Sequence, residues 1–205
     1  MQGGYSGPSI IINTHSPGAI LSQRVAAAAK GTKLLWSFGV LPGNTNLAGG
    51  VNNMTTAIPA AVATVKRADL ALLFVGDTHV SEFHDRTDNQ LEYAQDALLQ
   101  AVCATGVPTV VVLIAGHSIE LSHAKAQCDS ILYALLPSEF GGDAIVDTLL
   151  GKHSPAGRLP VTFYDHSIMI ARDPVDMKLR TSGGITYQHY TGTPLYEYGF
   201  GLSYR

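Results

Sequence analysis

The stretch Leu70-Ala-Leu-Leu-Phe-Val-Gly-Asp-Thr-His-Val-Ser-Glu-Phe-His-Asp-Arg86 joins an uninterrupted apolar run to a polar loop. The apolar run ends at Val75 and is preceded by a single acid, Asp69. Such a run is typical of a strand that is buried on both faces of a parallel sheet. Open α/β sheets bind their ligands beyond the carboxyl ends of the strands. Glu82, in the loop after this strand, is therefore the first candidate for a functional residue.

Two further apolar runs, residues 108–114 and 130–136, predict strands that are parallel and adjacent to the strand at residues 69–75. Shorter strands are expected at residues 33–38 and 158–163. Apolar stripes at helical spacing and capping signals predict helices between the strands, over residues 16–31, 55–67, 88–105, 120–127 and 142–150.

This alternation predicts an α/β fold, a three-layer α/β/α sandwich with a mostly parallel sheet. We expect one domain over residues 1–205, because no internal repeat and no second periodic region is found. Residues 164–205 are rich in Gly, Thr and Tyr and show little periodicity, so they are predicted to form an extended tail over the sheet layer.

The composition excludes several classes of function. A net charge of -3 and the lack of a Lys/Arg cluster give no reason to expect a nucleic-acid partner. The longest apolar stretches have only the length of strands, so no membrane-spanning helix is expected. Residues 1–8 have neither a basic start nor an apolar centre, so no signal peptide is predicted in this chain.

Two cysteines, Cys103 and Cys128, each fall just before a predicted strand. They can be neighbours on one edge of the sheet, but two free, largely buried thiols are the favoured interpretation. The triplet Asn53-Met54-Thr55 is the one glycosylation sequon, and it is a weak hint of secretion.

Familiar site motifs are missing from the sequence. No Gly-x-Gly-x-x-Gly follows a strand, and Val146 stands where a phosphate loop before Lys152 needs glycine, so no cofactor is expected. Ser118 lacks the second glycine of a nucleophile elbow. The histidines form no ligand pattern, and His117 and His123 are six residues apart, so no metal site is predicted.

Three loops follow the buried strands, at residues 76–87, 115–119 and 137–142. Because the carboxyl ends of parallel strands share one edge, polar side chains from these loops can approach one another: Glu82, His84, Asp85, His117 and Glu139. Asp85 and Arg86 are interpreted as an ion pair that shapes the first loop. Glu82 is expected to be partly exposed and free of a salt bridge to Arg86.

Several segments occur in a specific order along the chain. They are Ser-Glu-Phe-His-Asp-Arg-Thr (81–87), Thr-Val-Val-Val-Leu-Ile-Ala-Gly (109–116), Phe-Gly-Gly-Asp-Ala-Ile-Val-Asp (140–147), Ser-Pro-Ala-Gly-Arg-Leu-Pro-Val-Thr-Phe-Tyr (154–164) and Thr-Gly-Thr-Pro-Leu-Tyr-Glu-Tyr-Gly-Phe-Gly-Leu-Ser-Tyr (191–204). Together they resemble the C-terminal α/β-sandwich domain of glycoside hydrolase family three. Residues 82–87 and 176–180 are most similar to its β-xylosidase branch, which is also known for α-arabinofuranosidase activity.

The resemblance implies a retaining, exo-acting hydrolase that needs no cofactor. In this family an aspartate nucleophile lies on a separate N-terminal barrel domain. The general acid/base glutamate comes from the sandwich domain, three residues before an Asp-Arg pair. Glu82 occupies that place, and His84, Asp85, Arg86 and His117 are expected to shape the loop or to lie near the substrate. The implied partners are a glycoside substrate and a barrel domain, and the implied location is extracellular or in the secretory pathway.

The chain departs from the family pattern in several places. The barrel is not found within residues 1–205, the link between Arg86 and Gln90 is short, and Leu136-Pro-Ser-Glu139 replaces the usual Tyr-Pro-Gly-Gln turn. Two functions follow as hypotheses. The first is the acid/base half of a β-xylosidase-like or β-glucosidase-like enzyme, inactive without its barrel. The second is a non-catalytic remnant that binds a sugar or a partner protein. A flavodoxin-like nucleotide-binding domain fits the fold, but no motif supports it.

Overall fold

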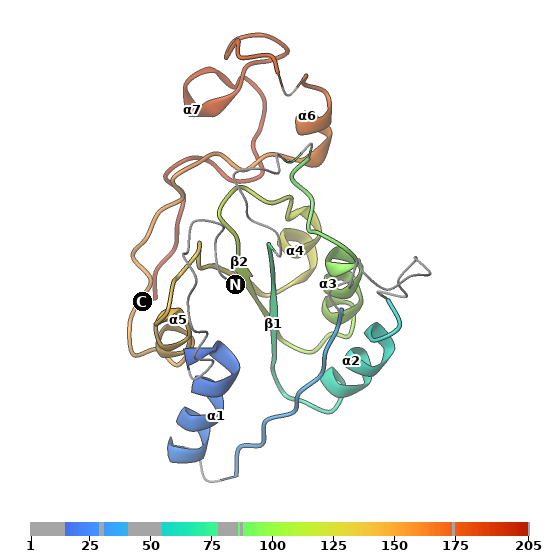
Figure 1. Cartoon of the computed structure of the whole chain (residues 1–205), viewed down its shortest axis with the longest axis vertical. Coiled ribbons are helices and arrows are strands. Elements are labelled where there is room, and N and C mark those ends of the chain that lie inside the picture. Colours follow the sequence, from blue (N-terminus) through green and yellow to red (C-terminus); the bar gives the residue numbers. More distant parts are fainter. Residues whose placement is uncertain are drawn as a thin grey trace, which may run out of the picture.

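A computed structural model of the chain describes residues 15–28, 31–40, 55–77, 86, 88–173 and 175–204 (Figure 1). At its centre lies a three-stranded parallel sheet of β1 (Ala71–Gly76), β2 (Thr109–Ile114) and β3 (Ser130–Tyr133), in the order β1-β2-β3. Leu73 pairs with Val111, and Val111 pairs with Ile131. The prediction of three adjacent parallel strands is confirmed, although β3 ends three residues earlier than expected.

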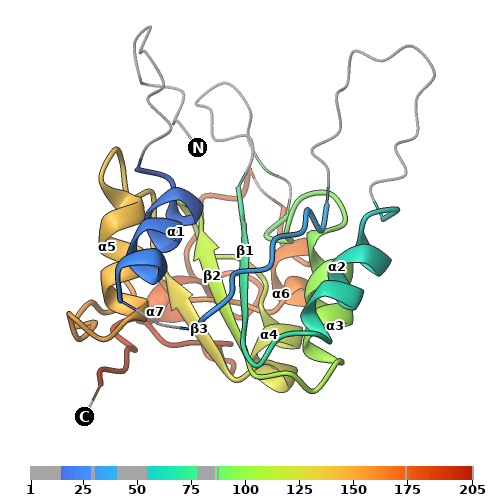
Figure 2. The same ribbon diagram turned by 90° about the horizontal axis from the view of Figure 1, so that it is seen from below.

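Helices cover both faces of this sheet (Figure 2). The helices α1 (Pro17–Ala28) and α5 (Gly141–Leu149) pack together on one face. The helices α2 (Ile58–Val65), α3 (Gln95–Cys103) and α4 (Ser122–Gln127) lie on the other face. The predicted α/β/α sandwich is therefore confirmed. Within the described ranges, no helix has the length and hydropathy needed to cross a bilayer.

Strand alternation divides the core between the two helical layers. Leu73, Val111 and Leu113 pack in one buried cluster with residues of α2, α3 and α4. Leu72, on the opposite face of β1, packs against the second cluster, which contains Ile20 of α1 and Val146 of α5. Burial on both faces explains why the strand sequences are apolar without alternation.

The start of α3 corrects one expectation. A helix was predicted from Asp88, but α3 begins at Gln95. Tyr93 has a positive φ of 57°, a conformation that a right-handed helix cannot contain. In addition, the main-chain oxygens of Asp88 and Gln90 accept hydrogen bonds from Arg86, so residues 88–92 are held in a loop.

Neither short predicted strand joins the sheet. Residues 33–38 have no regular secondary structure. Leu34 packs against the second cluster, whereas Trp36 and Phe38 remain largely exposed. The segment at 158–163 instead runs beside the end of the chain. The N–H of Phe163 donates to the Tyr196 oxygen at 2.9 Å, and these two residues form an antiparallel bridge.

The tail is less extended than predicted. It contains two short helices, α6 (His166–Ile170) and α7 (Thr186–His189), which lie beyond the carboxyl ends of the strands (Figure 1). The guanidinium of Arg172 donates hydrogen bonds to three main-chain oxygens between α6 and α7, those of Asp176, Lys178 and Thr181. These bonds fold the middle of the tail into a compact loop.

The interpretation of the cysteines as free thiols is wrong. Cys103, at the end of α3, and Cys128, directly after α4, form a disulfide with their Cα atoms 5.2 Å apart. The bond spans 25 residues of sequence and ties α3 to α4. Closing a loop of this length stabilises the folded state by about 3 kcal/mol in the chain-entropy description.

Candidate functional site

The end of β1 is shaped by Gly76. Its φ of 152° is rare for other residues, and a side-chain carbon there would lie 1.8 Å from the main-chain oxygen of Ile114. The side-chain amide of Gln95 accepts the N–H of Gly76 at 2.7 Å and donates to the Gly76 main-chain oxygen at 2.8 Å, as the main chain of a neighbouring strand would. Glycine and glutamine together fix the direction in which the chain leaves the sheet.

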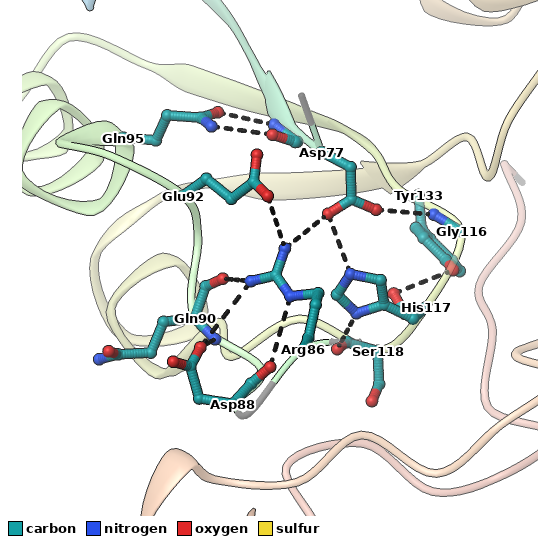
Figure 3. A network of polar contacts seen from close by, with 11 residues as sticks. Asp77, Arg86, Asp88, Gln90, Glu92, Gln95, Gly116, His117, Ser118 and Tyr133 are labelled. Carbon is teal, nitrogen blue, oxygen red and sulfur yellow. Dashed lines mark hydrogen bonds and ion pairs between the residues drawn. The ribbon is translucent and has the colours of Figure 1, made fainter. Parts of the chain in front are cut away.

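Asp77, the residue after β1, lies at the centre of a polar network (Figure 3). Only 1% of its surface is exposed. One carboxylate oxygen accepts hydrogen bonds from Arg86 Nη1 at 3.1 Å and from His117 Nε2 at 2.9 Å. The other oxygen accepts the N–H of Gly116 at 3.0 Å. Because both oxygens are occupied and buried, Asp77 is suited to hold other groups in place and not to attack a substrate.

Arg86 joins Asp77 to the segment that follows the loop. Besides Asp77, its Nη1 contacts Glu92 Oε1 at 3.3 Å, and its guanidinium also donates to the oxygens of Asp88 and Gln90. We expected Asp85 to be the partner of Arg86, but Asp85 lies outside the described residues. Among the described residues, the carboxylates of Asp77 and Glu92, and that of Asp88 at 3.8 Å, balance the arginine charge.

His117 reaches the same network from the loop after β2. Its Nε2 faces the carboxylate of Asp77 and its Nδ1 faces the main-chain oxygen of Ser118 at 2.9 Å, so both nitrogens face acceptors. This geometry requires both to carry protons and favours the imidazolium ion. The hydrogen bond to Asp77 raises the pKa of His117 more than burial lowers it, and the bond to Ser118 raises it further.

The pKa values of Asp77 and Tyr133 are also shifted from their usual values. Burial raises the pKa of Asp77, but the hydrogen bonds and charges of His117 and Arg86 and the Gly116 N–H together hold it below its usual value. Burial, with the negative charge of Asp77, raises the pKa of Tyr133 to about 12. The Tyr133 hydroxyl donates to the His117 oxygen at 3.3 Å. The site therefore favours an ionised aspartate, a protonated histidine and a neutral tyrosine.

The raised pKa of His117 predicts a pH-dependent contribution to stability. The contribution is complete below the unfolded-state pKa of 6.5 and is lost as the pH rises through the higher folded-state value. The free energy of unfolding of the wild type should therefore exceed that of His117→Gln by more at about pH 6 than at about pH 9. Urea unfolding of both proteins at the two pH values measures this. A difference that is independent of pH, or larger at high pH, contradicts a charged His117.

Asn89 connects the network to the tail. It is 2% exposed, and its Nδ2 donates to the main-chain oxygen of Tyr164 at 2.9 Å. Its Oδ1 lies 3.4 Å from Nδ1 of His166, and its main-chain oxygen accepts the N–H of Glu120 at 2.7 Å. Asn89 thus links the Arg86 segment to the beginning of the tail through its side chain and to the loop after β2 through its main-chain oxygen.

The structure brings together Arg86 and His117, two of the predicted site residues. Glu139 lies exposed after β3. Glu82, His84 and Asp85 lie outside the described residues. Asp77, Asn89 and Glu92 were not singled out from the sequence. The available signal for Asp77 was its place directly after a glycine at the end of a buried strand.

A hollow of about 360 Å³ opens beside Arg86 and is lined by residues 86, 88 and 90–93. The charged residues of its lining are Arg86, Asp88 and Glu92. Such groups can bind hydroxyls of a polar ligand. The fold and the network thus define an α/β/α sandwich domain with a charged, polar site at the carboxyl edge of its sheet.

Comparison with known proteins gives the family. Residues 1–204 match the model of the glycosyl hydrolase family 3 C-terminal domain, and the chain belongs to this family. It is 40% identical over 156 residues to a probable beta-D-xylosidase 7 of Arabidopsis thaliana, covering 72% of this chain and 20% of the relative. It is 33% identical over 212 residues to a probable exo-1,4-beta-xylosidase xlnD of Aspergillus terreus, covering 100% of this chain and 25% of the relative.

Solved structures agree. A GH3 exo-beta-xylosidase, XlnD, in complex with a xylobiose aziridine activity-based probe superposes with a TM-score of 0.82 at 30% identity, covering 99% of this chain and 26% of that one. A β-glucosidase of Erythrobacter marinus superposes with a TM-score of 0.70 at 26% identity, covering 98% of this chain and 29% of that one. The chain therefore spans about a fifth to a quarter of the curated relatives described here. The predicted family is confirmed.

Proposed function

We propose that this chain is the acid/base-bearing domain of a retaining, exo-acting glycoside hydrolase of the β-xylosidase type, with Glu82 as the proton donor. The observation that carries the proposal is the ion pair between Asp77 and Arg86, at 3.1 Å. These residues flank residues 78–85, so the segment that contains Glu82 leaves and re-enters the described structure at one point of the sheet edge. That edge is where α/β sheets bind ligands.

The charge balance of the network suits a proton donor in the adjoining loop. Arg86 is a cation and His117 favours its protonated form, and three carboxylates contact them, those of Asp77, Asp88 and Glu92. An uncompensated arginine would lower the pKa of a nearby glutamic acid and weaken it as an acid. Because Arg86 is already paired with Asp77 and Glu92, its charge is largely neutralised, and Glu82 remains available to protonate a leaving group.

The proposed reaction is a double displacement. A carboxylate from a barrel domain attacks the anomeric carbon while Glu82 protonates the glycosidic oxygen, and Glu82 then takes a proton from the water that hydrolyses the glycosyl-enzyme. In this proposal the 205 residues form one domain, and the barrel belongs to the rest of the enzyme. The names of the relatives support β-xylosides as substrates. The disulfide supports an extracellular or secretory location.

The direct test is activity with and without a barrel. The 205-residue chain alone should hydrolyse 4-nitrophenyl β-xyloside no faster than buffer, because a retaining displacement needs two carboxylates. A chimera in which this chain replaces the C-terminal domain of an xlnD-type xylosidase should hydrolyse the same substrate. Steady-state rates measure both.

The matched control is the same chimera carrying Glu82→Gln, which keeps the size of the side chain and removes the acid. It should lose most of the activity of the parent chimera on xylobiose, whose sugar leaving group needs a proton as its bond breaks. Full activity of the Glu82→Gln chimera, or robust turnover by the chain alone, contradicts the proposal.

A further inference from the structure

Three potential metal ligands converge between α3 and α4. Asp96 lies in the first turn of α3, Glu120 just before α4, and His123 within α4. One carboxylate oxygen from each acid and one ring nitrogen of His123 all lie within 4.8 Å of one another. We propose that these three side chains form a binding site for a divalent transition-metal ion of the zinc type, which is separate from the Asp77 network.

The spacing of the ligand atoms supports the site. Atoms bound to one tetrahedral zinc ion at about 2.0–2.2 Å lie roughly 3.4 Å apart. Nδ1 of His123 is 3.2 Å from both carboxylate oxygens of Asp96, so this pair already has the required separation. Glu120 supplies the third ligand atom, within 4.8 Å of the other two, while its Oε1 accepts the N–H of Ser122 at 2.6 Å.

The elements that carry the ligands are held rigidly. The disulfide from Cys103 to Cys128 joins the end of α3 to the residue after α4. Glu120 is anchored through its own N–H, which donates to the Asn89 oxygen at 2.7 Å. A site on elements that are already ordered requires little rearrangement when the ion binds.

Charge favours a cation at this position. Among the described residues, neither Asp96 nor Glu120 forms an ion pair with a lysine or arginine. Gln100 Nε2 donates to one Asp96 oxygen at 2.7 Å, which orients that carboxylate in the way that hydrogen bonds orient metal ligands. A divalent ion would neutralise both acids.

The ligand types select the class of ion. An imidazole combined with carboxylates suits zinc and related transition metals, whereas calcium and magnesium prefer ligand sets made only of oxygen. The side chains of His123 and Asp96 are 44% and 38% exposed, so an ion can enter from solvent and water can complete its coordination. Bound metal would tie α3 to the loop that carries both Glu120 and His117.

The test is calorimetric titration of the tag-free, EDTA-dialysed chain with zinc chloride, with cobalt chloride as a spectroscopic probe. We expect one saturable site, visible absorption bands from bound Co²⁺, and no saturable binding of calcium chloride. Asp96→Asn, which preserves the shape of the side chain, and His123→Ala should each weaken zinc binding by about 100-fold or more. The matched control is His153→Ala, because His153 is an exposed histidine far from these positions in sequence.

Each result decides the proposal. Saturable zinc binding that both variants lose and that His153→Ala keeps supports it. The wild-type titration alone overturns it if zinc does not saturate, or if calcium binds instead. Zinc binding that stays within about 3-fold of wild type in Asp96→Asn and His123→Ala also overturns it, since a site must depend on its ligands.

Discussion

Replacing Glu82 by alanine, in an enzyme that joins this chain to a family 3 barrel, will lower kcat/KM for xylosides with poor leaving groups by about 10²–10⁴-fold. Substrates with activated leaving groups will lose much less. A poor leaving group needs a proton as its bond breaks, whereas a nitrophenolate departs without one. The measurement is kcat/KM for a series of aryl xylosides, plotted against the pKa of the leaving group, and the plot should become steeper in the variant.

Glu139→Ala is the matched control for this experiment. Glu139 is a second glutamate predicted at the same edge, and it lies exposed after β3. Its removal should leave the slope of the plot unchanged. Equal losses for both classes of leaving group in Glu82→Ala would argue against a proton donor and for a role in shaping the loop.

The second large effect concerns the stability of the network. Asp77→Asn will lower the free energy of unfolding by about 3 kcal/mol, since breaking a buried ion pair from one side leaves uncompensated charge. Arg86 and His117, which face the buried Asp77 carboxylate, are the groups affected. Urea unfolding at neutral pH measures the change.

Asp69→Asn controls for the loss of one negative charge. Asp69 is exposed just before β1, so its replacement should change stability by no more than about 0.5 kcal/mol. If Asp77→Asn and Asp69→Asn are equally stable, Asp77 is not the centre of the network.

The strands β1 and β2 could be predicted because most of their residues are buried between two helical layers, and the residues of β3 after Ser130 are partly buried. Val111, Val112 and Leu113 are all 0% exposed, and such burial leaves a continuous apolar run in the sequence. The segment at 33–38 carries a similar run, yet Trp36 is 56% exposed and the segment joins no strand. An apolar run alone does not distinguish a strand of the sheet from an unpaired segment, because the sequence of the run does not show whether a neighbouring strand is there to form hydrogen bonds with it.

The site was predicted only in part, and the reason is again physical. The rule for parallel strands predicts that the loops after β1 and β2 share one edge, and His117 lies there against Asp77, the partner of Arg86. Asp77 was missed because an acid next to a buried strand is usually solvated, and its three partners come from positions 86, 116 and 117. The disulfide was missed for a related reason. Cys103 and Cys128 are 25 residues apart, and only the packing of α3 on α4 brings them together.

Glu82 is proposed to be the general acid/base of a retaining hydrolase. The most direct measurement is product analysis for the Glu82→Ala enzyme, containing its barrel, in the presence of sodium azide. Azide needs no general base, so it should enter the space left by the carboxylate and attack the covalent intermediate. We predict a partial recovery of the rate for an activated xyloside, with β-xylosyl azide as the product. An unchanged rate with only xylose released would contradict the assignment of Glu82.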